Sequence, residues 1–192
     1  MTEVKKYKMF IDGEWEDSES KKTFKTLNPE NNEPWAEVPE ASEKDIDKAV
    51  KAAQKAFEGK WPKLFPRERA KYLKAIAEQL RENAELLGKI ETIDTGKLFK
   101  ETKTQANYIA EYYDYYAGLA DKVEGTVLPI DKANMQVITT RVPIGVIAAV
   151  IPWNSQMLLT AVKLAPALAM GNTVVIKSVS YTHLTLPTIL LV

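Results

Sequence analysis

Residues Arg141 to Lys177 read RVPIGVIAAVIPWNSQMLLTAVKLAPALAMGNTVVIK and form the most apolar stretch of the sequence. Between Val142 and Ile176 the only charged residue is Lys163, although charged residues make up 27% of the chain. Because burying an unpaired ammonium is costly, Lys163 needs a partner or a lowered affinity for its proton. The expected core and the candidate site therefore fall in the same stretch.

This stretch predicts a strand, a helix and a second strand. Val146 to Ile151 is a short run of β-branched residues and alanine, as expected of a strand buried on both faces. Met157 to Met170 is long enough for a helix of about four turns, and Gly171 follows where a C-cap glycine belongs. Thr173 to Ile176 is β-branched again, so we expect a right-handed βαβ unit with a parallel sheet.

The ends of the two predicted strands carry the candidate site. In open parallel sheets, ligands bind beyond the carboxyl ends of the strands. Pro152, Trp153 and Asn154 leave the end of the first strand, and Lys177 leaves the end of the second. We therefore expect these residues to line one crevice.

Three motifs relate the sequence to a known family. They are IPWN at Ile151 to Asn154, KLAPALAMGNTVVIK at Lys163 to Lys177, and DTGK at Asp94 to Lys97. The first two are specific in combination and spacing. The sequence resembles the aldehyde dehydrogenase superfamily up to Lys177. The resemblance implies an α/β fold with wrapping β-strands, a helical layer, an oligomerisation hairpin and the first βαβ unit of a Rossmann-like domain.

The resemblance also implies catalytic roles for two residues. Asn154 matches the family's amide that donates hydrogen bonds to the oxyanion formed at the aldehyde carbon. Lys163 matches a lysine that supports proton movement together with an acid from elsewhere in the chain. From the residues alone, Asn154 also fits a turn asparagine, and Lys163 fits a snorkelling or structurally paired lysine.

NAD or NADP is the cofactor that the resemblance implies. Ile151, Pro152 and Trp153 resemble positions that line the cofactor cleft, although each taken singly fits simple packing. Lys177 matches the lysine whose ammonium bonds the hydroxyls of the adenosine ribose, with a surface lysine at a strand end as the alternative. The position that commonly distinguishes NAD from NADP is Ser180.

Upstream of residue 122 the pattern predicts strands and then helices. Strands are expected as a hairpin about Asp12-Gly13 and over 23–27 and 35–38. Helices are expected from Ser42, with a capping box, to near Gly59, then over 66–93 with a break near Asn83, and over 100–119. The resemblance implies that residues 1–121 form the amino-terminal strands and the helical part of the cofactor-binding domain, and that 142–177 start its Rossmann-like core.

Residues 122–141 predict two strands joined by a polar turn. In the family a hairpin here extends from the body and helps to join subunits, which implies a homo-oligomer. Exposed strand edges invite pairing, which supports a role in contact between copies. A hairpin folded onto its own domain is the alternative.

Composition excludes several classes of protein. The chain has 192 residues, a net charge of zero, one histidine and no cysteine. The charge gives no support for a nucleic-acid partner, and the missing cysteines exclude disulfides and thiolate metal sites. No signal-like or membrane-spanning stretch is evident, so a cytoplasmic protein without a membrane partner is expected.

Residues 178–192, SVSYTHLTLPTILLV, differ in character from the rest of the chain. They contain no Asp, Glu, Lys or Arg, and they resemble translated sequencing-adapter DNA more than the family. We therefore predict a non-native tail and assign His183 no role. A genuine edge strand over 182–186 is the alternative.

The function expected for the parent protein is NAD(P)-dependent oxidation of an aldehyde to a carboxylic acid. The family's nucleophilic cysteine, its general-base glutamate and its glycine-containing cofactor loop lie beyond the region that the resemblance covers. An amino-terminal fragment without a nucleophile is not expected to act alone. The alternative is a non-catalytic dehydrogenase-like protein that binds a nucleotide or a partner.

Overall fold

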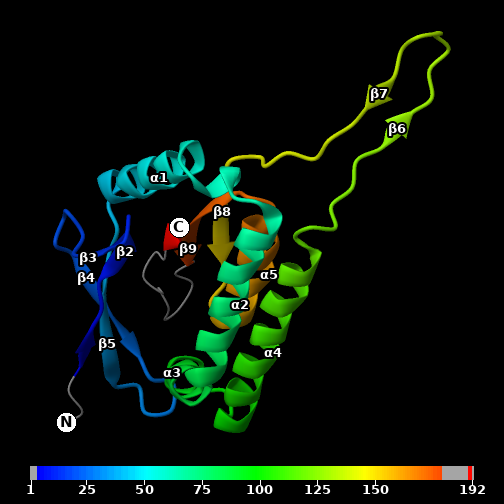
Figure 1. Ribbon diagram of the computed structural model, residues 1–192. Coiled ribbons are helices and arrows are strands. Elements are labelled where there is room, and N and C mark those ends of the chain that lie inside the picture. The colour runs from blue at the N-terminus through cyan, green and yellow to red at the C-terminus, as the bar shows by residue number, and fades with distance from the viewer. Residues whose placement is uncertain (1–3, 179–189, 192) are drawn as a thin grey trace.

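A parallel pair of strands, β8 (Val146–Ile151) and β9 (Thr173–Ser178), lies at the centre of the fold (Figure 1). The computed structural model describes residues 4–178 and 190–191. The helix α5 (Gln156–Ala169) joins the two strands, which pair in one unbroken parallel register. The predicted βαβ unit is confirmed.

Helix α5 ends in a tight backbone reversal at Gly171. Its φ of +83° is a conformation that glycine adopts without strain. The Gly171 N–H donates to Leu168 at 3.0 Å and the Asn172 N–H donates to Ala167 at 3.0 Å, which satisfies two carbonyls of the last turn. A Cβ on Gly171 would lie 3.2 Å from Pro143. The predicted C-cap glycine is therefore confirmed.

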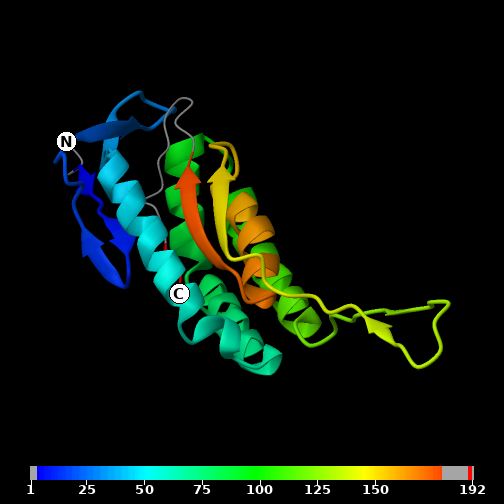
Figure 2. The same cartoon turned by 90° about the horizontal axis from the view of Figure 1, so that it is seen from above.

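The two faces of the β8–β9 pair are covered by different helices (Figure 2). Val174 and Ile176 join the core that includes α5, whereas Val175 packs with Ala49 and Ala53 of α1 (Glu43–Glu58). This alternation follows from the period of two along a strand. The sheet pair is thus sandwiched between α1 and α5.

The prediction that the strand over 146–151 is buried on both faces is wrong. On the α1 side, Ala148 is exposed and Val150 is 48% exposed, whereas Ala149 and Ile151 are buried toward α5. Helix α1 packs against β9 more extensively than against β8. An apolar groove of about 480 Å³ remains there, with Ala49, Val146 and Val150 in its wall.

A layer of helices packs on the side of α5 that faces away from the β8–β9 pair. It consists of η1 (Trp61–Lys63), α2 (Pro66–Glu82), α3 (Ala84–Thr95) and α4 (Phe99–Leu119). Asn83 separates α2 from α3, as the sequence predicted. The inner faces of η1, α2 and α4 share one apolar core with α5, and α3 packs on α4, so the layer holds α5 on the sheet.

Five short strands precede the helices. The capping box predicted at Ser42 is present at the start of α1, with Asp45 as its other member. Met9 and Ile11 of the first hairpin pack against α1, and a separate sheet has the order β1-β5-β4. The strands are β1 (Lys5–Lys6), β2 (Met9–Ile11), β3 (Glu14–Glu16), β4 (Thr23–Leu27) and β5 (Pro34–Pro39).

The segment between α4 and β8 leaves the body as a long hairpin (Figure 1). Only β6 (Val127–Leu128) and β7 (Val137–Ile138) pair within it, so the alternative of a hairpin folded onto its own domain does not apply. Most of the predicted tail lies outside the described residues, apart from Ser178 in β9 and β10 (Leu190–Leu191). In the described ranges, no helix is long and apolar enough to cross a bilayer.

Replacing Gly171 by alanine tests the reversal after α5. Because an L-residue at positive φ costs about 1–2 kcal/mol, the free energy of unfolding from urea titration should fall by about that amount. Gly118→Ala is the matched control, since a Cβ there meets nothing within 4 Å. In the last turns of α4 it should leave stability unchanged or raise it. Equal losses in both variants would contradict this account.

Candidate active site

The carboxyl ends of β8 and β9 meet at one edge of the sheet pair. Pro152, Trp153 and Asn154 follow β8 directly, and Lys177 lies in β9 opposite Val150. Ile151 is fully buried against the α5 core, whereas Trp153 is 41% exposed and Asn154 is exposed. An exposed indole and amide thus sit beside a buried strand end.

The two lysines predicted at the site have backbone partners. Lys177 is exposed, and its ammonium donates to the carbonyl of Ser178 at 2.6 Å. Lys163 is half-buried on α5, and its ammonium donates to the carbonyl of Val150 in β8. The partner that Lys163 requires is therefore a neutral carbonyl next to the candidate site.

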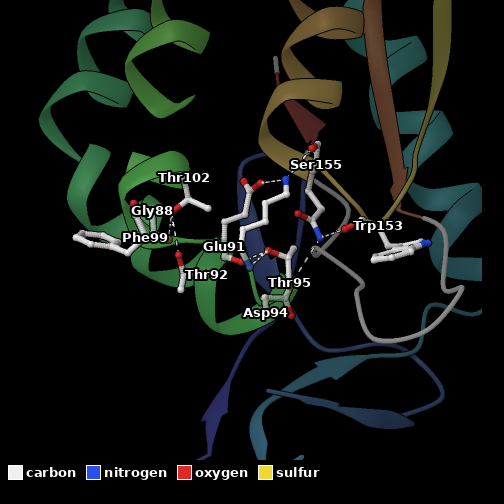
Figure 3. A network of polar contacts seen from close by, with 11 residues as sticks. Gly88, Glu91, Thr92, Asp94, Thr95, Phe99, Thr102, Trp153 and Ser155 are labelled. Atoms are coloured by element: carbon white, nitrogen blue, oxygen red, sulfur yellow. Dashed lines mark hydrogen bonds and ion pairs between the residues drawn. The ribbon is translucent and has the colours of Figure 1, made fainter. Parts of the chain in front are cut away.

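A polar network links the turn after β8 to the end of α3 (Figure 3). The Lys97 ammonium donates to Glu91 Oε1 at 2.9 Å and to Ser155 Oγ at 2.7 Å. The side chain of Glu91 is only 3% exposed and that of Lys97 is 28% exposed. A largely buried ion pair therefore contacts the residue that follows Asn154.

Asp94 forms the second part of the network. Its carboxylate accepts hydrogen bonds from Thr26 on β4 at 3.1 Å and from Gln156 at 3.4 Å. The same Gln156 amide donates to the carbonyl of Trp153. Burial raises the pKa of Asp94 to about 7, an effect that the Thr26 hydrogen bond opposes and the nearby Glu91 charge reinforces.

The local sequence explains why the network forms at the DTGK motif. Helix α3 ends at Thr95, and Gly96 follows with φ +74° and donates its N–H to Thr92 at 2.9 Å. This left-handed residue reverses the chain, which suits glycine. Lys97 consequently comes back beside the last turns of α3, within reach of Glu91.

Sequence reasoning quoted Asp94 and Lys97 only as part of a motif and missed Glu91, Ser155 and Gln156. One signal was available. Glu91 and Asp94 are three residues apart, so on a helix they share a face. That face packs inward, and acids buried in this way require partners. The partners themselves come from segments that no sequence pattern connects to α3.

Comparison with known proteins identifies the family. The model of the aldehyde dehydrogenase family matches residues 15–192. The chain belongs to the aldehyde dehydrogenase family. The family match continues through the segment after Ser178, whereas the sequence analysis predicted that the resemblance ends at Lys177. The origin of that segment stays a prediction.

Relatives in the aldehyde dehydrogenase family are clearly similar over most of the chain. A (Z)-2-((N-methylformamido)methylene)-5-hydroxybutyrolactone dehydrogenase from Acinetobacter baylyi is 46% identical over 91% of this chain and 36% of its own length. A betaine aldehyde dehydrogenase from Bacillus subtilis is 43% identical over 92% of this chain and 36% of its own. The chain spans about a third of the length of these relatives.

Solved aldehyde dehydrogenases have the same fold over the shared part. A betaine aldehyde dehydrogenase from Staphylococcus aureus, solved with NAD+, matches with a TM-score of 0.86 and 37% identity over 89% of this chain and 35% of its own. An NAD-dependent aldehyde dehydrogenase from Sinorhizobium meliloti matches with a TM-score of 0.89 and 30% identity over 94% of this chain and 36% of its own. The predicted fold class is confirmed.

Asp94→Asn tests the buried carboxyl. A folded pKa of about 7, against 3.8 ordinarily, means that the folded chain holds its proton more tightly than the unfolded chain. The free energy of unfolding should therefore fall by about 2–3 kcal/mol between pH 5 and pH 8, and less in Asp94→Asn. An asparagine can still accept from Gln156 and donate to the Thr26 hydroxyl.

The measurement is urea unfolding of both chains across that pH range. Asp47→Asn, at an exposed position of α1, is the control and should follow the wild-type profile. A wild-type chain whose stability does not decline relative to Asp94→Asn would show that Asp94 titrates normally.

Proposed function

We propose that this chain is the part of an NAD(P)-dependent aldehyde dehydrogenase that forms the floor of the cofactor site and supplies the oxyanion-binding amide. The observation that carries the proposal is the position of Trp153, Asn154 and Lys177 at one carboxyl edge of β8–β9. Ligands of open parallel sheets bind at this edge. NAD+ in the Staphylococcus aureus relative gives independent support.

The residues present at this edge fit a dinucleotide. Lys177 offers an exposed ammonium that can donate to ribose hydroxyls, and Trp153 offers an apolar surface. Pro152 is half-buried beside Trp153, whereas the Ile151 side chain is buried in the α5 core, so only the backbone of Ile151 can face the cofactor. When bound, the oxidised nicotinamide accepts a hydride, so that an aldehyde and water become a carboxylate.

Asn154 is proposed to stabilise the oxygen of the aldehyde as it gains negative charge. A neutral amide donates a hydrogen bond without forming an ion pair, and one such donor is worth about 3–4 kcal/mol in other enzymes. Its exposure at the strand end supports access by a substrate. Lys163, held on the Val150 carbonyl, is proposed to assist proton movement together with an acid from elsewhere in the chain.

A second candidate function follows from the absence of cysteine. The chain contains no thiol nucleophile, so the purified 192 residues should produce no NADH from aldehydes. A non-catalytic dehydrogenase-like protein would still bind a nucleotide or a partner chain. Nucleotide binding without turnover fits both functions, whereas a cysteine codon further along the gene would count against the second. Turnover by the 192-residue chain would contradict both.

Lys177→Met tests the cofactor site in the chain as it stands. With 5-fluorotryptophan labelling, NAD+ should shift the 19F resonance of Trp153, and the variant should bind about tenfold more weakly because a charge-assisted hydrogen bond is lost. Trp153→Phe assigns the resonance. Lys25→Met, an exposed lysine on β4, is the matched control. If NAD+ leaves the 19F resonance of Trp153 unchanged in the wild-type chain, the proposal loses its support.

We also propose that the hairpin of β6 and β7 joins copies of the chain. Val127 and Ile138 face each other across the two strands, and each is 60% exposed far from the body. Exposed apolar residues on a projecting strand edge favour contact with another chain. The expected partner is a second copy.

Placing lysine at both Val127 and Ile138 should therefore dissociate the oligomer. Sedimentation velocity is expected to give a species larger than the 21.6 kDa chain for the wild type and a monomer for the double variant. Leu86→Lys, which changes an apolar residue on α3 that is 54% exposed, should leave the oligomer intact. A monomeric wild-type chain would refute the assignment.

A further inference from the structure

The turn that carries Asn154 is held from both sides by the end of α3. After Asn154, the Ser155 hydroxyl accepts a hydrogen bond from Lys97 at 2.7 Å. Before it, the Trp153 carbonyl accepts from Gln156, which also donates to Asp94. Figure 3 shows the two connections converging from α3 on the turn.

We propose that Lys97 and Asp94 are positioning residues for Asn154. Lys97 holds the hydroxyl of Ser155 after that residue, and Asp94, through Gln156, holds the carbonyl of Trp153 before it. Together the two contacts restrict the directions in which the Asn154 amide can point. The inference rests on the proposed role of Asn154 as an oxyanion donor. A donor must be aimed before the reaction, because its contribution depends on preorganisation.

The Lys97 connection is anchored by a buried carboxylate. Glu91 is 4% exposed, and within the described residues its Oε2 atom has no hydrogen-bond partner. Lys97 is the cation that compensates this charge, at 2.9 Å. Releasing the lysine would leave a buried charge unpaired, which is strongly unfavourable. The ammonium therefore stays in place, and its remaining donors are available to hold Ser155.

The Asp94 connection runs through a buried amide. Gln156 is 3% exposed and bridges the Asp94 carboxylate and the Trp153 carbonyl. Asp94 is itself tied to β4 by the Thr26 hydroxyl at 3.1 Å. This chain of contacts links the turn to the amino-terminal sheet as well as to α3.

A purely structural role for the network is the competing explanation. In that case, losing Lys97 would lower the stability of α3 without altering the motion of Asn154. Positioning predicts that losing Lys97 increases the motion of Asn154. Removing the Ser155 hydroxyl should have the same effect, because Lys97 acts through that hydroxyl. The two explanations therefore differ in a measurement made at Asn154.

The test uses the full 192-residue chain with selective 15N-asparagine labelling and NMR relaxation. Asn154→Ser assigns the signal. In the wild-type chain the backbone order parameter at Asn154 should be near the value of about 0.85 seen for rigid backbone. In Lys97→Met, which keeps the aliphatic stem, it should fall below about 0.6. Lys97→Arg should restore much of the order.

Lys103→Met is the matched control, because it removes an ion pair with Glu85 at 3.2 Å on the exposed side of the same helices. It should leave Asn154 rigid. Ser155→Ala keeps the Lys97–Glu91 pair and should loosen Asn154 to a similar extent as Lys97→Met. The double variant should add nothing further, since both changes break one contact.

The proposal fails if Asn154 is already mobile in the wild-type chain or stays rigid in Ser155→Ala. Should Lys97→Met not fold, Ser155→Ala decides alone, because it leaves no buried charge unpaired. The proposed function fails separately, when NAD+ leaves the Trp153 resonance of the wild-type chain unchanged. The positioning role is thus tested by the motion of Asn154 without NAD+, whereas the proposed function is tested by the Trp153 resonance after NAD+ is added.

Discussion

The parallel pairing of β8 with β9 is the constraint on which the rest of the structure depends. Parallel neighbours cannot be joined by a tight turn, so the chain must cross one face of the sheet, and α5 makes that crossing. The crossing brings both carboxyl ends to one edge. At the amino ends of the two strands, the Asn172 side chain accepts hydrogen bonds from the N–H groups of Ile144 and Gly145 at 2.7 and 3.0 Å. These bonds tie the start of β8 to the end of α5.

The same pairing creates a difficulty at the carboxyl edge. In the proposed function the turn offers its indole and amide to a ligand and is therefore exposed, and exposed turns are mobile unless something holds them. Here hydrogen bonds to the Trp153 carbonyl and the Ser155 hydroxyl hold the turn, and the Asn154 side chain remains exposed. The cost is two buried acids at the end of α3, of which Asp94 shows a raised pKa.

Much of the fold follows from local sequence signals. The strand over 146–151, the capping box at Ser42, the break at Asn83 and the glycine after α5 are each set by residues close in sequence. The exposed face of β8 could not be predicted in the same way, because a run of apolar residues does not reveal how far α1 extends over it. Burial of a strand face depends on the partner element as much as on the strand.

The candidate site likewise has a part that the sequence predicts and a part that depends on packing. Its exposed members, Trp153, Asn154 and Lys177, could be placed from the rule that ligands meet the carboxyl ends of parallel strands. The network beneath them joins residues 58 and 62 positions apart, such as Lys97 with Ser155 and Asp94 with Gln156. Contacts of that kind depend on how α3 packs, and neither periodicity nor turn chemistry encodes the packing.

Two lysines near the candidate site have partners of different kinds. Lys97 faces Glu91, whose side chain is 3% exposed, so the ion pair holds the Lys97 side chain in place. Lys163 donates to the neutral carbonyl of Val150, and its described contacts include no carboxylate. The ion pair thus supports the positioning role proposed for Lys97, whereas the contact with Val150 shows only where the Lys163 side chain lies.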